Sequence, residues 1–329
     1  MKKENTKIFK DFITKKNREK YLFTPGPGSL TAENLIHQQS CFGRNDQSYE
    51  KLENQVLRRL KIMSGHKNII RLQGSASLAL EILINNFLFG KVLVISTGYY
   101  SDRLKLLCDQ SKKNFKNIKN IKSISWENIS EVSEKFDWII GCATETSMGL
   151  KVPILDLYKL KKRTKAKLAL DATASIGLEK DHHYSDVLAY SSCKGLFGLT
   201  GASFIAYNIL PNNLVESFYL SLKSHEDKKM TGPYHSILSL AGVLPVHEEL
   251  KVSVKINKLK FLEKMHLWLT KDKTNEPLLC TYTKYKFRNK EKNVILYKTR
   301  LNIEGSVVCH LGELHLKSKA KGKILDLLK

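Results

Sequence analysis

Short apolar runs alternate with longer amphipathic stretches from about residue 70 to about residue 207. Five of the runs are apolar enough for strands that are buried on both faces of a sheet, and they span residues 91–96, 138–142, 167–171, 187–191 and 203–207. The stretches between them have helical spacing, and residues 77–84 predict a helix that opens on a serine cap. Strands separated by helices predict an α/β fold with a mainly parallel sheet covered on both faces.

The pattern changes after about residue 215. Residues 231–270 have helical spacing, whereas residues 277–314 contain short apolar runs separated by turn residues. We therefore expect three parts along the chain. They are a basic N-terminal extension over residues 1–20, a large domain with an N-terminal arm over residues 21–245, and a small α+β domain over residues 246–329.

Composition places the chain among globular proteins. It has 329 residues, of which 42% are hydrophobic. This is enough for a large hydrophobic core that needs no disulfide bonds or metal ions to hold it together. No apolar stretch has the length of a membrane span, and the N-terminus lacks the apolar centre of a secretory signal. The six cysteines form no CxxC pair, which is typical of free thiols in a reducing compartment. We expect a cytoplasmic protein with neither a metal site nor a membrane partner.

The formal net charge is +23, which raises the possibility of a nucleic-acid partner. The lysines, however, are spread from one end of the chain to the other. The sequence contains no stripe of aromatic residues and arginines, no zinc finger and no RNA-binding motif that would turn this charge into recognition. A lysine-rich solvated surface is the favoured interpretation, and no nucleic-acid partner is expected.

Polar residues follow the predicted strands in a regular order. A small polar turn, "LQGSAS" over residues 72–77, leads into a helix, and two tyrosines follow a strand in "STGYYSDR" over residues 96–103. Four polar side chains then stand together in "ATETSMG" over residues 143–149, and Asp171 ends an apolar strand in "LDATASIG". Last comes Lys194, placed between small residues and glycines in "SSCKGLFGLTGASF". Ligands of α/β sheets bind beyond the carboxyl ends of the strands, where these motifs lie.

This combination fits the chemistry of pyridoxal 5′-phosphate. A helix N-terminus with hydroxyl groups binds a phosphate dianion, and an aromatic ring stacks on a flat cofactor. A lysine amine forms a Schiff base with the cofactor aldehyde, and an aspartate keeps the pyridine nitrogen protonated. Each motif alone is weak, but their order at successive strand ends predicts a cofactor site built around Lys194 and Asp171.

The same motifs resemble those of the class V aminotransferases of fold type I. Within that family the sequence is most similar to 2-aminoethylphosphonate–pyruvate transaminases. The resemblance covers roughly residues 20–245, from "LFTPGPGSL" near the start to "KKMTGPYHSILSL" over residues 228–240. It implies a large domain with a seven-stranded type of sheet, a short C-terminal domain, and a homodimer whose active sites are shared between the two subunits.

The resemblance also assigns roles to individual residues. It implies that Lys194 forms the Schiff base and that Asp171 faces the pyridine nitrogen. The other implied cofactor contacts come from six segments: Ser75, Ala76 and Ser77 at the phosphate, with Thr231 from the partner subunit; Tyr100 above the ring and Thr173 below it; Thr146 or Ser147 near the ring hydroxyl; and Cys193 beside the lysine.

Two positions depart from the family pattern. Cys193 stands where the family has a polar residue, so one phosphate contact is expected to be lost. Val307 stands where an arginine normally binds the substrate carboxylate. Arg44, Arg103 and Arg300 are the candidates to replace that arginine, with Arg44 and Arg300 as the assigned substrate residues.

The predicted activity is transfer of an amino group between 2-aminoethylphosphonate and pyruvate. Lys194 is expected to move the proton between the substrate carbon and the cofactor carbon. Three alternatives remain open at this point: another class V reaction, such as alanine–glyoxylate transamination or a lyase; a cofactor-binding protein with degenerate activity; and a basic nucleic-acid binder.

Overall fold

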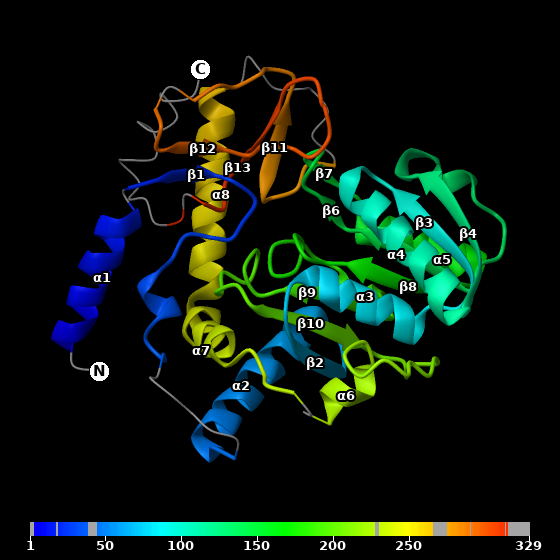
Figure 1. Cartoon of the computed structure of the whole chain (residues 1–329). Helices are drawn as coiled ribbons and strands as arrows, with labels where there is room; N and C mark the ends of the chain where they lie inside the picture. The colour runs from blue at the N-terminus through cyan, green and yellow to red at the C-terminus, as the bar shows by residue number, and fades with distance from the viewer. Residues whose placement is uncertain are drawn as a thin grey trace. The chain divides into compact units, whose positions relative to one another are not determined.

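The structure is a computed structural model of the chain, and it describes residues 3–17, 19–38, 45–227, 230–265, 275–289, 291–312 and 314. The chain divides into two compact units, coloured along the sequence in Figure 1. The first unit comprises Met1–Arg59, Ser192–Thr200 and Tyr234–Lys329, and the second comprises Leu60–Ser191 and Gly201–Pro233. The domain boundaries expected at residues 21 and 246 stay predictions.

The second unit is built on a seven-stranded sheet. In spatial order its strands are β2 (Asn68–Gln73), β10 (Ala202–Tyr207), β9 (Val187–Ser191), β8 (Lys167–Asp171), β5 (Trp138–Cys142), β3 (Gly90–Ser96) and β4 (Ile118–Ser125). Neighbouring strands from β9 to β4 run parallel, and β10 runs antiparallel to both β9 and β2. The expected α/β architecture with a mainly parallel sheet is confirmed.

The five strands predicted from apolar runs are present with bounds that agree to within one residue. They lie inside the sheet, and every residue of β5, β9 and β10 is buried. The sequence analysis did not identify β2 or β4, which form the two edges. On β4 the side chains of Lys119 and Lys122 are exposed, and such lysines keep an edge strand from pairing with another chain.

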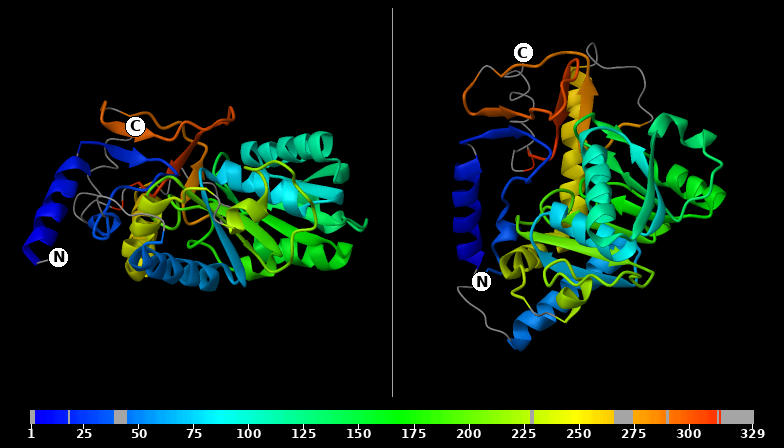
Figure 2. Two further views of the ribbon diagram at one scale, coloured as in Figure 1. Left: turned by 60° about the horizontal axis from the view of Figure 1, so that its bottom comes forward. Right: turned by 45° about the vertical axis from the view of Figure 1, so that its right-hand side comes forward.

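Helices cover the sheet of the second unit. Helix α3 (Ala76–Phe87) packs on β9 and β10, and α4 (Tyr99–Phe115) packs on β3, β4 and β5; Figure 2 shows both helices along the same face of the sheet. Helix α5 (Ile154–Thr164) packs on β8. The serine cap expected at the start of residues 77–84 is corrected: the helix begins at Ala76, its N-cap is Ser75, and Ser77 lies within the first turn.

Short elements complete the second unit. They are η2 (Trp126–Glu131), β6 (Thr144–Glu145), β7 (Leu150–Lys151), η3 (His182–Tyr184) and α6 (Leu222–Glu226). Helix α2 (Gln47–Ser64) has residues in both units.

No helix of the described residues combines the length and the apolar character that crossing a membrane needs. In those same ranges, no three histidine, cysteine or carboxylate side chains gather into a group that could hold a metal ion.

The first unit combines helices with small sheets. Its elements are α1 (Lys3–Asn17), β1 (Tyr21–Phe23), η1 (Ala32–Asn34), α7 (Tyr234–Val243), η4 (Leu244–Val246), α8 (His247–Lys264), β11 (Cys280–Thr283), β12 (Val294–Leu296) and β13 (Ser306–Cys309). Strand β1 pairs in parallel with β12, and β11 pairs antiparallel with β13. The helices expected in residues 231–270 and the short strands expected in residues 277–314 are confirmed for the described residues.

A histidine lies in the core of the first unit. His310 is 1% exposed, its Nε2 atom lies 3.0 Å from Thr281 Oγ1, and its carbonyl accepts a hydrogen bond of 3.1 Å from the Asn257 amide. Burial, with a smaller contribution from the nearby Lys258 charge, lowers the pKa of His310 to about 3. The folded protein therefore holds this imidazole neutral at physiological pH.

We predict that acidification weakens the fold through His310. Its pKa is lower in the folded state than the ordinary value of 6.5, so below pH 6.5 the unfolded chain binds more protons than the folded one. The stability that His310 contributes is present above pH 6.5 and falls by about 1.4 kcal/mol per pH unit on the acid side, or about 2 kcal/mol at pH 5. Urea unfolding of wild type and His310→Gln at pH 7, 6 and 5 measures this loss. Equal pH dependence in the two proteins would contradict the prediction.

Candidate active site

Asp171 is the buried carboxylate at the carboxyl end of β8. Its side chain is 2% exposed. One carboxylate oxygen accepts a 2.9 Å hydrogen bond from the Thr173 amide, and the other lies 3.5 Å from Nη2 of Arg103. A buried carboxylate needs a charged or hydrogen-bonding partner. In this structure Arg103, from the first turns of α4, is that partner.

Arg103 connects three of the residues that the sequence analysis selected. Besides contacting Asp171, it donates a 3.1 Å hydrogen bond from Nη1 to the hydroxyl of Ser77, and its guanidinium carbon lies 5.0 Å from the centre of the Tyr100 ring. The guanidinium thus lies between the strand that ends in Asp171 and the turn that begins α3. Sequence reasoning considered Arg103 for a substrate carboxylate and missed its pairing with Asp171.

The turn before α3 presents groups that suit an anion. Ser75 is the N-cap of this 12-residue helix, and its side chain makes no capping hydrogen bond. The first amides of a helix have no intrahelical partner and favour negative charge. The cationic Arg103 at Ser77 adds to this preference. Ser75 is the N-cap of α3 and Ala76 and Ser77 are its first residues, and the role of all three as phosphate ligands stays a prediction.

Thr231 lies beside this turn in the same chain. In the amide orientation that satisfies both of its polar atoms, the side chain of Gln73 donates to the carbonyl oxygens of Thr231 at 2.9 Å and Gly232 at 3.2 Å. Gln73 ends β2, next to the turn that leads into α3. The contact brings the backbone of Thr231 to the proposed phosphate turn of its own subunit. The assignment of Thr231 to the partner's site stays a prediction.

Glu145 organises the other side of the site, and sequence reasoning missed it. This glutamate has no exposed surface, and one of its oxygens accepts hydrogen bonds from the amides of Tyr100 at 2.9 Å and Ser101 at 3.2 Å, as well as from the Thr97 hydroxyl. The other oxygen accepts from the amide and hydroxyl of Ser147. Glu145 therefore fixes Tyr100 and Ser147, two predicted site residues, to each other.

Two opposing effects act on the pKa of Glu145. Burial raises the pKa of Glu145 above its ordinary value, while the donors of Ser147, Ser101 and Tyr100 oppose that rise. The carboxylate lies at the start of α4, where a negative charge is favourable. The pattern "TETS" contained one signal for this role, because a carboxylate inside a polar run that follows a buried strand must find donors nearby.

Several buried hydroxyl groups of the second unit have no hydrogen-bond partner among the described residues, and two of them belong to predicted site residues. Thr146 Oγ1 and Thr173 Oγ1 make no hydrogen bond with any described residue, although both atoms are inaccessible to solvent. Buried polar atoms are almost always satisfied, so such orphans call for a ligand or water. Thr173 adjoins Asp171 through its amide, and Thr146 stands between Glu145 and Ser147. The donor set therefore fits a cofactor that carries a ring nitrogen, a hydroxyl group and a phosphate.

The segment that carries Lys194 belongs to the first unit, and its backbone is firmly held there. The amide of Gly28 donates to the carbonyl of Cys193 at 3.0 Å, and His247 Nε2 lies 2.8 Å from the carbonyl of Gly195. At Gly26 a Cβ atom would lie 2.9 Å from Lys194 Cγ, so no larger residue fits beside the lysine stem. This arrangement fixes the position from which Lys194 extends, as expected for a lysine with a defined role.

The other positions considered for substrate binding are Arg300, Val307 and Arg44. Arg300 is exposed on the segment between β12 and β13, and Val307 is 2% exposed within β13. Val307 packs with Cys280 and Cys309 in a small apolar cluster. Arg44 lies outside the described residues. The role of each arginine toward a substrate stays a prediction.

Known proteins of similar sequence have names that agree with the chemistry of this site. No family model matches the chain. Over 222 residues it is 28% identical to the bifunctional phosphonoacetaldehyde hydrolase/aminoethylphosphonate transaminase of Clostridioides difficile, covering 63% of this chain and 35% of that protein. Over 206 residues it is 27% identical to a 2-aminoethylphosphonate–pyruvate transaminase of Pseudomonas aeruginosa, covering 57% of this chain and 54% of the relative. The chain therefore spans about a third to a half of these relatives' length.

Solved structures with the same fold cover most of the chain. An aspartate aminotransferase of Thermus thermophilus matches with a TM-score of 0.77 at 17% identity, covering 93% of this chain and 97% of its own. An alanine–glyoxylate aminotransferase of a Nostoc species matches with a TM-score of 0.77 at 17% identity, covering 93% and 95%. The predicted fold, type I of the pyridoxal phosphate-dependent transferases, is confirmed, as is the resemblance to class V aminotransferases.

Proposed function

We propose that this chain is a pyridoxal phosphate-dependent aminotransferase that moves an amino group between 2-aminoethylphosphonate and pyruvate. The observation that carries the proposal is the cluster around Asp171 in the second unit. There a buried carboxylate, an arginine, the hydroxyl-rich start of α3 and the orphaned hydroxyl of Thr173 lie together. The names of the relatives from Clostridioides difficile and Pseudomonas aeruginosa support the phosphonate substrate.

The chain's own residues would hold the cofactor as follows. Ser75, Ser77 and the amides at the start of α3 would bind its phosphate, since they offer donors to a dianion. Asp171 would keep the proton on the ring nitrogen, and the orphaned hydroxyl of Thr146 would bond the ring hydroxyl. When bound, pyridoxal phosphate supplies an electron sink for the carbon that bears the amino group.

Lys194 would carry out the proton transfer. A lysine held by its backbone in one position can take a proton from the substrate carbon and return it to a neighbouring atom, provided that its amine is neutral at that moment. The contacts of Gly28 and His247 with the flanking carbonyls hold that backbone. Tyr100 and Thr173 would flank the ring and keep water from it. A homodimer with shared sites is the proposed working unit.

The choice of donor follows from Val307. Without an arginine at this place an α-carboxylate loses a charge-assisted contact worth about 1.5–3 kcal/mol. A donor whose anionic group lies at the far end from the amine is less affected, and 2-aminoethylphosphonate has this form. The net charge of +23 draws anions to the protein but does not orient them. Alanine–glyoxylate transfer is the second candidate, supported by the Nostoc structure's name.

We predict faster amino transfer from 2-aminoethylphosphonate than from alanine or serine at equal concentration, with a high KM for pyruvate. The purified protein loaded with pyridoxal phosphate is mixed with each donor, and the change in the cofactor's absorbance band gives the rate of the half-reaction. A faster half-reaction with an α-amino acid would show an aminotransferase with a different substrate. A band that no donor shifts would contradict aminotransferase activity itself.

A further inference from the structure

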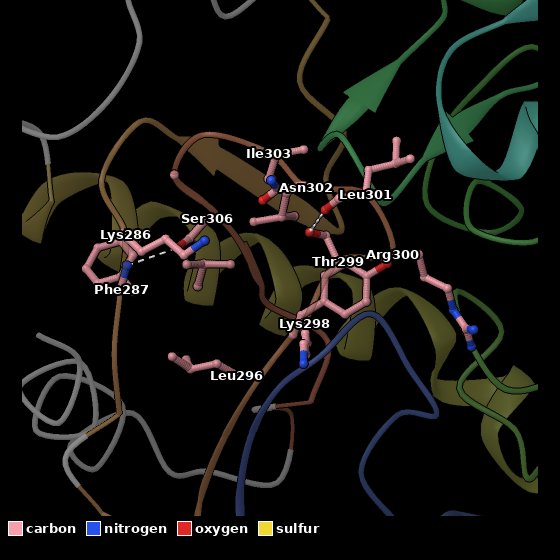
Figure 3. A pocket seen from close by; sticks show the side chains of 14 residues that line it. Lys286, Phe287, Leu296, Lys298, Thr299, Arg300, Leu301, Asn302, Ile303 and Ser306 are labelled. Carbon is pink, nitrogen blue, oxygen red and sulfur yellow. Dashed lines mark hydrogen bonds between the residues drawn. The ribbon is translucent and has the colours of Figure 1, made fainter.

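A pocket of about 450 Å³ lies in the first unit, lined by residues 286–287, 296–303 and 305–308. Figure 3 shows its side chains around the segment that joins β12 to β13. This volume is in the range of sites that hold small organic ligands. None of the residues proposed for the cofactor lines the pocket, whereas Arg300 and Val307, which were considered for the substrate, do.

The pocket has an apolar wall. Phe287, Val307 and Val308 are buried residues of this wall, and Leu296 is half buried beside them. Phe287 and Val308 belong to the core cluster of the unit, which makes this wall a rigid surface. An apolar group that packs against this wall is removed from water, which favours binding. A rigid wall also loses little conformational entropy when a ligand binds.

The remainder of the lining is cationic. Lys286, Lys298 and Arg300 contribute three positive charges, and no aspartate or glutamate is among the described residues that line the pocket. Lys286 and Lys298 make no hydrogen bond or ion pair within the described ranges, and the amide of Asn302 is equally unused there. Ammonium groups that are not neutralised beside an apolar surface favour an anion over a neutral molecule.

The hydroxyls of Ser306 and Thr299 in the lining take part in hydrogen bonds. Ser306 Oγ accepts a 2.9 Å hydrogen bond from the amide of Phe287, and Thr299 Oγ1 donates a 2.8 Å bond to the carbonyl of Leu301; both are drawn in Figure 3. These bonds hold the shape of the pocket. A ligand would therefore meet cationic side chains and the Asn302 amide.

We propose that this pocket binds an organic anion with an apolar body. The anionic group would contact one of the lysine ammonium groups that line the pocket, Lys286 or Lys298, and the apolar body would lie on Phe287, Leu296 and Val307. Two sources share this chemistry: a substrate or product of the proposed reaction, and a separate organic acid that acts as an effector. Binding itself does not depend on the proposed function.

The test uses a pair of matched fluorescent probes. The anion 8-anilinonaphthalene-1-sulfonate and its uncharged analogue N-phenyl-1-naphthylamine share an apolar body and differ in the sulfonate. We expect the anion to bind with a single strong site per chain, at least about tenfold tighter than the neutral probe, because the sulfonate gains charge-assisted contacts. Equal affinity of the two probes would overturn the proposal.

Three variants locate the binding. Lys298→Glu reverses one charge and should weaken sulfonate binding by about tenfold or more, while Asn302→Trp should fill the pocket and remove binding of both probes. Both residues are exposed, so thermal melting should show folded proteins. Lys292→Glu, an exposed lysine outside the pocket, is the matched control with unchanged affinity. Equal effects of the three variants would overturn the proposal.

Displacement distinguishes the two sources. If 2-aminoethylphosphonate or pyruvate displaces the sulfonate probe at the concentrations that support turnover, the pocket serves the reaction. If the probe persists at those concentrations, the pocket takes a separate organic acid. Because probe binding is measured without the cofactor, failure of the aminotransferase assay and failure of the pocket proposal are separate results.

Discussion

Lys194→Ala is expected to abolish turnover and the covalent attachment of pyridoxal phosphate. Lys194 is half buried, and the carbonyls on either side of it are bound by Gly28 and His247, so its removal should take away the reacting amine and leave the loop in place. Borohydride treatment of wild type followed by peptide mapping should find the cofactor on the peptide that contains Lys194. Lys180→Ala, which removes an exposed lysine, is the control and should keep full activity.

A label on a different lysine would contradict this assignment of the site. So would a Lys194→Ala protein that retains turnover above the uncatalysed rate. Thermal melting separates the alternatives, because a lysine with only a structural role would lower the melting temperature together with the rate. The expected variant melts close to wild type and is inactive.

The second large effect is expected at Asp171. Asp171→Asn keeps the size of the side chain and removes the charge that would hold the ring nitrogen protonated. We expect a loss of about a thousandfold or more in kcat, which corresponds to about 4 kcal/mol in the activation barrier. The measurement is single-turnover kinetics with 2-aminoethylphosphonate, together with the absorbance spectrum of the bound cofactor.

Arg103→Gln is the informative companion variant. It removes the guanidinium that lies 3.5 Å from Asp171 and leaves the carboxylate in place. If Asp171 only pairs with Arg103, the two variants should lose stability and activity to a similar extent. If Asp171 acts on the cofactor, Asp171→Asn should lose far more rate than Arg103→Gln. An Asp171→Asn enzyme within tenfold of wild type would contradict the catalytic role.

The interior of the sheet was predictable because burial on both faces produces an unbroken apolar run. Strands β5, β8 and β9 match their predicted bounds for this reason. The edges were not predictable in the same way. In β4 isoleucines recur at every third position, 118, 121 and 124, between lysines and polar residues, a spacing closer to a helix than to a strand. In β2 the apolar run is interrupted by Arg71.

The candidate site was also predictable in part only. Asp171 stood out because a carboxylate at the end of a buried strand needs a partner, and Lys194 because it stands between small residues and glycines. Glu145 and the pairing of Arg103 with Asp171 did not, because they depend on contacts between segments far apart in sequence. Glu145 meets Tyr100 at a separation of 45 residues, and Arg103 meets Asp171 at 68. No local pattern encodes such a meeting, which only packing creates.

The position of Arg103 has a consequence for the cofactor-free protein. Its guanidinium is a planar cation that faces Asp171 on one side and the hydroxyl of Ser77 on the other. A protonated pyridine ring would pair with Asp171, and the phosphate of the same cofactor would bind Ser77. In the proposed enzyme, Arg103 would have to give up Asp171 and Ser77 when the cofactor binds, and the measured affinity would be the difference between two ion pairs rather than the strength of one. The unloaded protein would then be spared an uncompensated buried charge, and it could wait for its cofactor without unfolding.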